Sequence, residues 1–112
     1  MKKIEAIIRP EKLDSVRHAL EKVSSPGLMI TEIEGHGKQK GITRQWRGKE
    51  YKVELLSKIK IEVIVKDKDV DLITKTISEA AHTGSIGDGK IFIYPVENAI
   101  RIRTAEQGDV AV

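Results

Sequence analysis

A glycine-rich turn that ends in a lysine carries the residues of this chain best suited to bind a phosphate group. It spans residues 83–90 and contains Gly84, Gly87 and Gly89 before Lys90. Glycines permit positive φ and let backbone N–H groups approach an anion, and a lysine beside them adds a positive charge. The pattern therefore predicts a phosphate-binding turn, although a glycine-rich connection between a helix and a strand has the same pattern without any ligand.

The letters from Gly84 to Lys90 satisfy the P-loop pattern G-x-x-x-x-G-K. However, Ile91 stands where a P-loop has the Ser or Thr that binds magnesium. The order of elements is also reversed, because a helical pattern precedes the turn and a strand pattern follows it. The turn is therefore not a Walker A motif, and any phosphate binding here would belong to another fold.

A pair of arginines near the C-terminus is a second candidate anion site. Arg101 and Arg103 lie two positions apart in residues 99–103, where apolar and basic side chains alternate. A strand over these residues would place both arginines on one face of a sheet. Such pairs are usually solvated charges at a sheet edge, unless an anion lies opposite them.

A basic segment without a regular period lies between these strand and helix patterns. It runs from Gly37 to about Lys52 and predicts a long loop, which in a compact domain is usually functional or disordered. Trp46, the only tryptophan, lies in the middle of it and would either anchor a partner or pack locally. The basic residues of the segment are Lys38, Lys40, Arg44, Arg47, Lys49 and Lys52.

Length and composition limit the classes of protein that fit. At 112 residues the chain predicts one domain with a single modest core. The absence of cysteine excludes disulfides and thiolate metal sites and allows a reducing cytoplasmic setting. No apolar run reaches the ~20 residues of a membrane helix, and Met1-Lys2-Lys3 does not lead into a signal sequence. We therefore expect a soluble cytoplasmic protein.

The composition also bears on two alternative functions, nucleic-acid binding and catalysis. The net charge is +3 with 33% charged residues of both signs, so the basic excess is small, and only 4% aromatics argues against base stacking on a sheet. The three histidines are scattered along the sequence, at His18, His36 and His82. No nucleophile or group of metal ligands has the spacing of a catalytic or metal site. A binding protein is therefore favoured over the alternatives, a slow ATPase or a nucleic-acid-binding module.

The first half of the chain predicts a strand, a helix and a second strand. Residues 4–8 form an apolar run, and Pro10 suits the first turn of a helix. Residues 28–34 again predict a strand. Apolar side chains between the two strands recur at helical spacing, and they are Leu13, Val16, Leu20 and Val23.

The second half repeats this order. Residues 59–65 have the clearest period of two in the chain. The acidic residues of 67–71 could cap a helix, and residues 91–94 predict a last strand that ends at Pro95. The apolar stripe of the helix between them consists of Val70, Ile73, Ile77, Ala80 and Ala81.

Two strand–helix–strand units joined by a long loop predict an α+β fold, the ferredoxin-like split βαβ arrangement. This βαββαβ order gives a four-stranded antiparallel sheet with two helices on one face. The sheet would carry more apolar surface than two helices on one face can cover. We therefore expect an oligomer that buries the other face. The apolar residues assigned to that face are Ile4, Met29, Ile33 and Ile64.

Four motifs together give the chain a close resemblance to the PII nitrogen-regulatory signal proteins. They are Gly35-His36-Gly37-Lys38-Gln39-Lys40-Gly41, Arg47-Gly48-Lys49-Glu50-Tyr51, residues 83–93, and Arg101-Ile102-Arg103. The resemblance covers essentially the whole length. It implies a homotrimer of one domain, residues 1–112, with an output loop at about 37–55, a phosphate loop at about 82–90 and a C-terminal segment at about 99–112.

The resemblance also implies the ligands. ATP or ADP would bind between neighbouring subunits, through Gly35, Gly37, Lys38, Gln39, Ile64, Gly87, Asp88, Gly89, Lys90, Arg101 and Arg103. The effector 2-oxoglutarate would bind beside ATP through Gln39, Lys40, Gly41, Lys58 and Gly87. Gln39 would ligate Mg²⁺ together with the ATP phosphates, which suits the hard oxygen ligands that magnesium prefers.

Signal output would pass through the long loop to an ammonium transporter, glutamine synthetase or another target of nitrogen assimilation. Arg47 resembles the arginine that enters the mouth of an ammonium channel, so membrane association would be reversible and indirect. Tyr51 matches a tyrosine that some relatives have uridylylated. The chain departs from the family pattern at Met29, His36, Lys38 and Ser57, which bears on the ligand preference.

Overall fold

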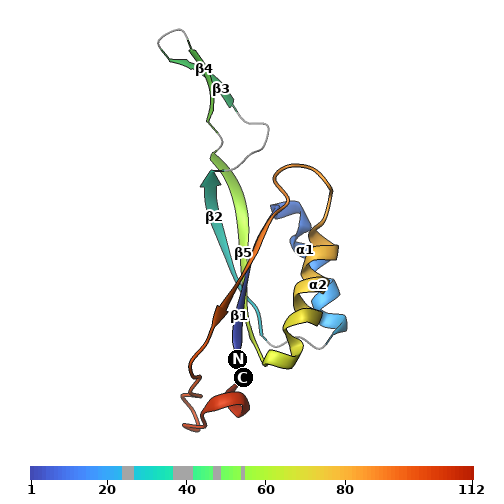
Figure 1. Cartoon of the computed structure of the whole chain (residues 1–112), viewed down its shortest axis with the longest axis vertical. Coiled ribbons are helices and arrows are strands. Elements are labelled where there is room, and N and C mark those ends of the chain that lie inside the picture. Colours follow the sequence, from blue (N-terminus) through green and yellow to red (C-terminus); the bar gives the residue numbers. More distant parts are fainter. Residues whose placement is uncertain (24–26, 37–41, 47–48, 54) are drawn as a thin grey trace.

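The chain was analysed as a computed structural model, which describes residues 1–23, 27–36, 42–46, 49–53 and 55–112 and, from 35 to 55, only their backbone. Figure 1 labels the main elements. They are β1 (Lys2–Ile8), η1 (Pro10–Lys12), α1 (Leu13–Lys22), β2 (Met29–His36), β3 (Ile42–Trp46), β4 (Lys49–Val53), β5 (Leu55–Val65), η2 (Asp67–Asp69), α2 (Val70–Ala81), β6 (Gly89–Pro95) and η3 (Gly108–Ala111). Within these described ranges, no helix has the length and apolar character needed to cross a membrane.

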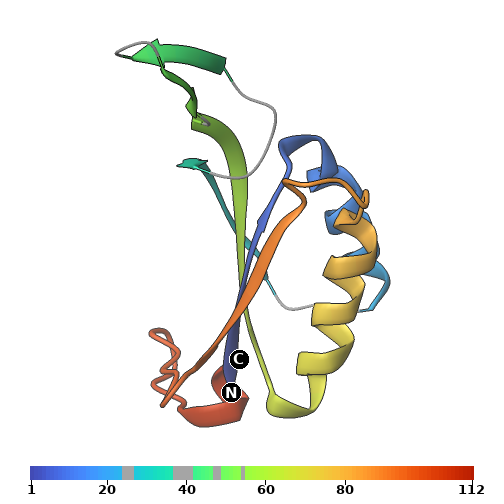
Figure 2. The ribbon, with the colours of Figure 1, turned by 45° about the horizontal axis from the view of Figure 1, so that its top comes forward.

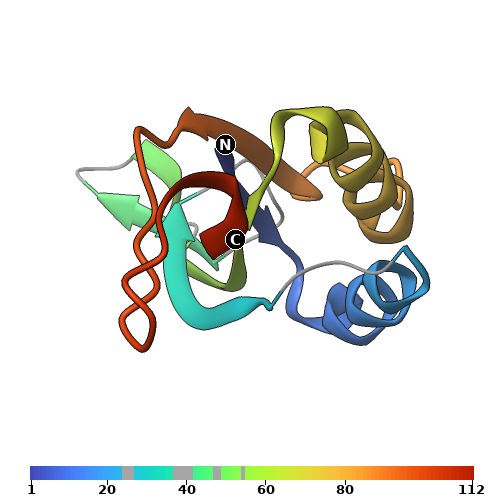
Figure 3. The same cartoon turned by 90° about the horizontal axis from the view of Figure 1, so that it is seen from below.

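Four strands form one antiparallel sheet in the order β2-β5-β1-β6. Seen from below, α1 and α2 lie next to each other on the same side of this sheet (Figure 3). Each half of the chain thus contributes one helix, one central strand and one edge strand. The predicted α+β class, with its ferredoxin-like βαββαβ order, is confirmed.

The core lies between the two helices and the sheet. Alternate residues of β1 and β5 point to the helices, and the apolar stripes of α1 and α2 cover them, because side chains alternate along a strand and recur every three to four residues along a helix. Burying each large aliphatic side chain contributes about 1.5–3 kcal/mol. The fully buried large residues are Ile4, Ile8, Val16, Leu20, Ile61, Val63, Val65, Ile73 and Ile77.

The structure corrects one assignment to the open face of the sheet. Ile4 was assigned to it wrongly: Ile4 pairs with Val63 and is fully buried beneath the helices. Met29, paired with Glu62, is 52% exposed and does belong to the open face. Side chains alternate along a strand, and in β1 the buried positions are Ile4, Ala6 and Ile8. Ile4 therefore faces the core.

A two-stranded hairpin occupies part of the segment where the sequence predicted a loop. Strands β3 and β4 pair antiparallel, with Arg44 opposite Tyr51. The hairpin extends beyond the ends of β2 and β5, as two views show (Figures 1 and 2). The predicted lack of strands was therefore wrong for these residues. A separate ribbon need not present an apolar face to a core, so its sequence lacks the period that identifies a sheet strand.

The C-terminal residues 99–103 form a turn where the sequence predicted a strand. Only a single bridge, Ile100 with Gln107, pairs this region, and Ala105 has a φ of 61°. The amide of Ala105 donates to the carbonyl of Arg101 at 2.7 Å, which closes the turn. Alternating residues need a neighbouring strand to make a sheet. The amide of Val96 still donates to the carbonyl of Met1 at 3.2 Å, but after it the hydrogen bonds of this segment, among the described residues, join residues of the segment itself.

The acids before α2 do not cap it as predicted. Asp69 occupies the N-cap position without a side-chain hydrogen bond to the helix. The carboxylate of Asp67 instead accepts a hydrogen bond of 2.9 Å from the amino group of Met1. This hydrogen bond and the positive charge of the amino group lower the pKa of Asp67. The 3₁₀ turn η2 provides the entry to the helix instead.

Candidate functional site

The glycine turn joins the end of α2 to the start of β6. Gly84, Gly87 and Gly89 have φ values of 89°, 103° and 103°, a region that other residues rarely adopt. At Gly89 the backbone also passes so close to β1 that a Cβ atom would lie 1.7 Å from the carbonyl oxygen of Ile7. Glycine is thus required here by both conformation and space.

The carboxylate of Asp88 holds the turn together from within. It accepts hydrogen bonds from the amide of Thr83 at 2.8 Å and the amide of Gly84 at 2.9 Å. It also accepts one from the hydroxyl of Thr83. These bonds, first that of the hydroxyl and then those of the amides, hold the pKa of Asp88 well below its usual range. The side chain of Asp88 therefore shapes the turn, and any anion would meet the backbone instead.

Arg9 ties this turn to the rest of the fold, and sequence reasoning missed it. Its Nε lies 3.0 Å from Oδ1 of Asp88, and its Nη2 donates to the carbonyl of Ile86 at 2.8 Å. The pairing of Ile8 with Gly89 brings Arg9 to the turn, because β1 ends where β6 begins. The signal available in the sequence was a basic residue directly after a strand, which is too common to identify a site.

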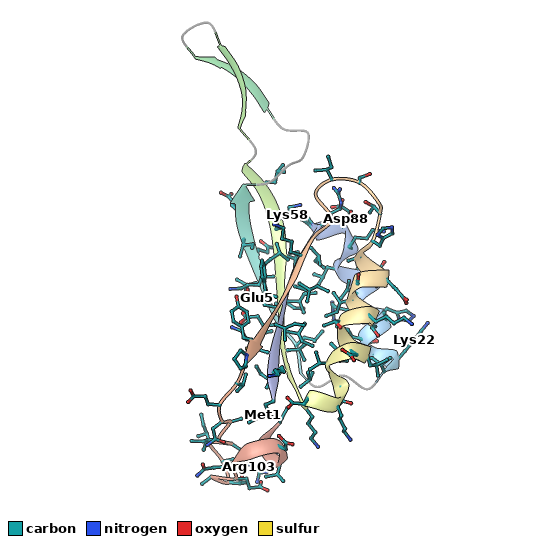
Figure 4. All side chains as sticks on the ribbon, in the orientation of Figure 1. Met1, Glu5, Lys22, Lys58, Asp88 and Arg103 are labelled. Atoms are coloured by element: carbon teal, nitrogen blue, oxygen red, sulfur yellow. The ribbon has the colours of Figure 1, made fainter. Side chains whose placement is uncertain are left out.

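Lys58 approaches the same turn from β5. Its side chain is only 8% exposed, and Nζ donates a hydrogen bond of 2.7 Å to the carbonyl of Gly87. Burial lowers the pKa of Lys58, and the positive charge of Arg9 lowers it further, while Glu11 and Asp88 act in the opposite direction. Lys58 and Asp88 are labelled near one another in Figure 4.

One hollow lies beside Lys58, and a second borders the turn itself. One of about 430 Å³ lies between η1, β2 and β5 and is lined by Pro10, Glu32, Ile33, Glu34, Ser57, Lys58 and Ile59. The other, of about 360 Å³, lies between α2 and β6 and is lined by Ile8, Ile77, Ser78, Ala81, His82, Asp88, Gly89, Lys90 and Ile91. The exposed backbone of the turn and two lysines therefore face accessible space.

The two C-terminal arginines lie far from this turn in the same chain. Figure 4 shows Arg103 at the lower end of the molecule and Asp88 well above it, at the upper end of the helices. The side chain of Arg101 is held by Glu106 at 2.7 Å and by the carbonyl of Val110 at 2.9 Å. A ligand that contacts both the turn and these arginines would therefore have to lie between two chains.

The remaining predicted site residues are only partly described. Gly35 lies near the end of β2, opposite Leu56, and Ile64 is half-buried on the open face of the sheet, opposite Lys3. Tyr51 lies in the backbone of β4. The predicted residues that lie outside the described part of the chain are Gly37, Lys38, Gln39, Lys40, Gly41 and Arg47.

Comparison with known proteins identifies the family. The model of the family "Nitrogen regulatory protein P-II" matches residues 1–106. The chain belongs to the P-II family. It is 54% identical over its full length to "Nitrogen regulatory protein P-II 2" of Methanothermobacter thermautotrophicus, covering 97% of that protein. It is also 54% identical, over the full length of both chains, to P-II proteins of Azospirillum brasilense and Escherichia coli K12.

Membership of the P-II family places the chain among proteins of nitrogen regulation. The names of its relatives describe regulators, which fits a protein that acts by binding. Among the described residues, no cluster of three or more histidines and acids could hold a metal ion.

Proposed function

We propose that this P-II protein is a nitrogen-status sensor that binds ATP or ADP at the seams of a homotrimer. The observation that carries this proposal is the pre-shaped glycine turn, in which the carboxylate of Asp88 is bonded within the turn and Lys90 follows directly as an exposed positive charge. Because the turn is fixed before a ligand arrives, binding would cost little ordering of the chain.

Charge complementarity supports a nucleotide with two or three phosphates. Lys90 and the amides of residues 87–89 would contact the phosphates from one subunit, and Arg101 and Arg103 would do so from the next. Arginine forks bind phosphate oxygens in pairs, while lysine acts as a point charge. Gly35 and Ile64 would line the part of the cleft that receives the nucleoside, together with Gly37, Lys38 and Gln39.

The second effector in this proposal is 2-oxoglutarate, bound beside Mg-ATP. Lys58 would pair with its distal carboxylate, for which it is well placed because Nζ already lies beside Gly87. Gln39, Lys40 and Gly41 would supply the remaining contacts. The magnesium would sit between Gln39 and the phosphates, since an amide oxygen and phosphate oxygens form a hard donor set.

The output would be a contact made by the hairpin segment rather than a reaction. Residues 37–55 would change conformation with the ligand, so that a partner responds to the coupling free energy between the two sites. The partner would be an ammonium transporter, glutamine synthetase or another nitrogen-assimilation target. Arg47 would enter a transporter and bring the protein to a membrane indirectly, and Tyr51 could be uridylylated.

Titration calorimetry tests the nucleotide site directly. We expect saturable binding of Mg-ATP and of ADP by the wild-type chain, stronger binding of Mg-ATP when 2-oxoglutarate is present, and at least about ten-fold weaker binding by Lys90→Ala. Lys75→Ala is the matched control, because Lys75 is an exposed lysine on α2 that forms an ion pair with Glu79. No heat from either nucleotide at millimolar concentration would contradict the proposal.

A pull-down from native lysate tests the output. Wild-type protein is immobilised and washed with Mg-ATP plus 2-oxoglutarate or with ADP. We expect a transporter or an assimilation enzyme to be retained in one buffer and released in the other. Identical partners in both buffers would contradict a ligand-dependent output while leaving nucleotide binding intact.

A further inference from the structure

The C-terminal turn holds a carboxylate against an arginine that the proposed function assigns to phosphate. Nη1 of Arg101 lies 2.7 Å from Oε1 of Glu106, and the hydroxyl of Thr104 donates to the same oxygen at 2.8 Å. The amide of Glu106 in turn bonds the hydroxyl of Thr104 at 3.2 Å. Glu106 is thus fixed by several contacts in the position that an anionic oxygen would take.

The backbone reinforces this arrangement. The amide of Arg101 donates to the carbonyl of Glu106 at 2.9 Å, and Ala105 between them adopts a left-handed φ of 61°. This conformation turns the chain back so that residue 106 returns to residue 101. The ion pair is therefore built into the turn and does not depend on a chance meeting of two long side chains.

We propose that Glu106 is an internal competitor for the phosphate site, which occupies Arg101 until a nucleoside di- or triphosphate displaces it. This inference rests on the proposed nucleotide site. A phosphate carries more charge than a carboxylate and offers oxygens to both guanidinium nitrogens, so it can replace Glu106. Anions that bind weakly or carry a single charge cannot displace Glu106. Glu106 therefore makes binding at Arg101 depend on the charge of the anion.

Displacement of Glu106 would also affect the end of the chain. Nη2 of Arg101 donates to the carbonyl of Val110 at 2.9 Å, within the 3₁₀ turn η3. A phosphate that takes both nitrogens of Arg101 removes both of these contacts together. Occupation of the site is thereby coupled to release of the C-terminal turn from Arg101.

Two neighbouring residues provide internal comparisons. Among the described residues, none forms a hydrogen bond or ion pair with the side chain of Arg103, which is exposed and ready for an anion. Glu97 lies in the same segment and is also exposed, and within the described chain it has no charged partner. A change at Glu97 alters the charge of the segment without touching Arg101.

The test compares Glu106→Gln with Glu97→Gln by titration calorimetry with ADP. We expect Glu106→Gln to bind ADP about three- to ten-fold more tightly than the wild type, because Arg101 no longer has to leave a charged partner. Glu97→Gln should bind as the wild type does, within about two-fold. Inorganic phosphate bound at Arg101 should gain by a similar factor, because it has to displace the same carboxylate.

A second variant and a second measurement distinguish the loss of the ion pair from a general loss of structure. Thr104→Ala keeps the charge of Glu106 but removes the hydroxyl that orients it, so a smaller gain in ADP affinity is expected. Without nucleotide, hydrogen exchange at the amides of Arg101 and Ala105 should be faster in Glu106→Gln than in Glu97→Gln, since the ion pair closes this turn.

The outcomes separate this inference from the proposed function. If the wild type binds ADP but Glu106→Gln binds it equally or more weakly, Glu106 does not compete with phosphate and the inference is wrong while the nucleotide site stands. Equal exchange in Glu106→Gln and Glu97→Gln would show that the pair does not close the turn, which also overturns it. If the wild type binds no ADP, both this inference and the proposed nucleotide site are wrong.

Discussion

Asp88 illustrates how a residue in a candidate binding turn can serve the turn rather than the ligand. Its carboxylate accepts hydrogen bonds from Thr83, Gly84 and Arg9, so its charge is already balanced by donors of the chain. This arrangement resolves an apparent conflict in the sequence, where an acid stands among the groups expected to bind phosphate. The negative charge is bonded within the turn, whereas Lys90 is exposed.

The low pKa of Asp88 predicts a specific pH dependence of stability. A carboxyl whose pKa is depressed in the folded state stabilises the protein above its unfolded pKa of about 4, and this contribution is lost as the pH falls through the folded pKa. We therefore expect the free energy of unfolding to fall more steeply below about pH 4 in the wild type than in Asp88→Asn, as measured by urea unfolding. Near pH 7 this group should add no slope.

Asp14→Asn is the control for this experiment. Asp14 lies exposed in the first turn of α1 and lacks a side-chain partner among the described residues. Its loss should leave the acid-side slope close to that of the wild type. The same slope in Asp88→Asn and the wild type would show that the hydrogen bonds of Asp88 do not persist in solution.

The glycines of the turn should differ sharply in their tolerance of alanine. Gly89→Ala places a Cβ atom 1.7 Å from the carbonyl oxygen of Ile7, so β1 and β6 would have to separate. We expect a loss of more than about 3 kcal/mol of unfolding free energy. Gly84→Ala meets only His82 at 3.7 Å and should cost about 1–2 kcal/mol for its positive φ.

Denaturant unfolding of the two variants measures this contrast. Both substitutions add one methyl group to a positive-φ position, so conformational strain alone would destabilise them equally. Equal losses would mean that β6 does not lie as close to β1 as described.

At the scale of elements, the two helices are held by narrow apolar stripes. Ile77 of α2 is 1% exposed, whereas Leu72 of the same helix is 49% exposed. Ile77→Ala should cost about 2–5 kcal/mol, since it leaves a cavity in the core. Leu72→Ala should cost less than about 1 kcal/mol. Thermal or chemical unfolding would show the difference, and similar costs would contradict the orientation of α2.

At the scale of the whole molecule, the separation of the turn from the C-terminal arginines predicts complementation between chains. Lys90→Ala damages the glycine turn, and Arg103→Ala damages the distant C-terminal turn. Each variant alone should bind ADP weakly. If the proposed trimer forms, refolding both variants together would give mixed trimers in which some seams combine an intact turn with intact arginines, so part of the binding should return.

The control mixes each variant with itself under the same refolding conditions. Calorimetry then measures the number of tight sites in every sample. If the mixture binds no better than its two components, the turn and the arginines do not share a ligand across chains. The calorimetry of Lys90→Ala alone would then still test whether the turn binds the nucleotide.

The sequence predicted the layers of this fold because its periods were unambiguous. Apolar residues at helical spacing identified α1 and α2, and the strict alternation at 59–65 identified β5. The glycine turn was also evident, since positive φ and close packing select glycine. These are local requirements, and a local requirement leaves its mark on neighbouring residues in the sequence.

Tertiary structure decided everything that depends on which elements meet. Residues 99–103 alternate like a strand, yet they form a turn, because in the part of the chain that the structure describes they pair through a bridge with Gln107 and not with a strand. Arg9 and Lys58 reach the glycine turn only because β1 lies between β5 and β6. Whether Asp88 faces a ligand or its own loop, and whether Arg101 is paired or open, follows from contacts between distant residues. Such contacts are set by the packing of the whole chain, which no local period records.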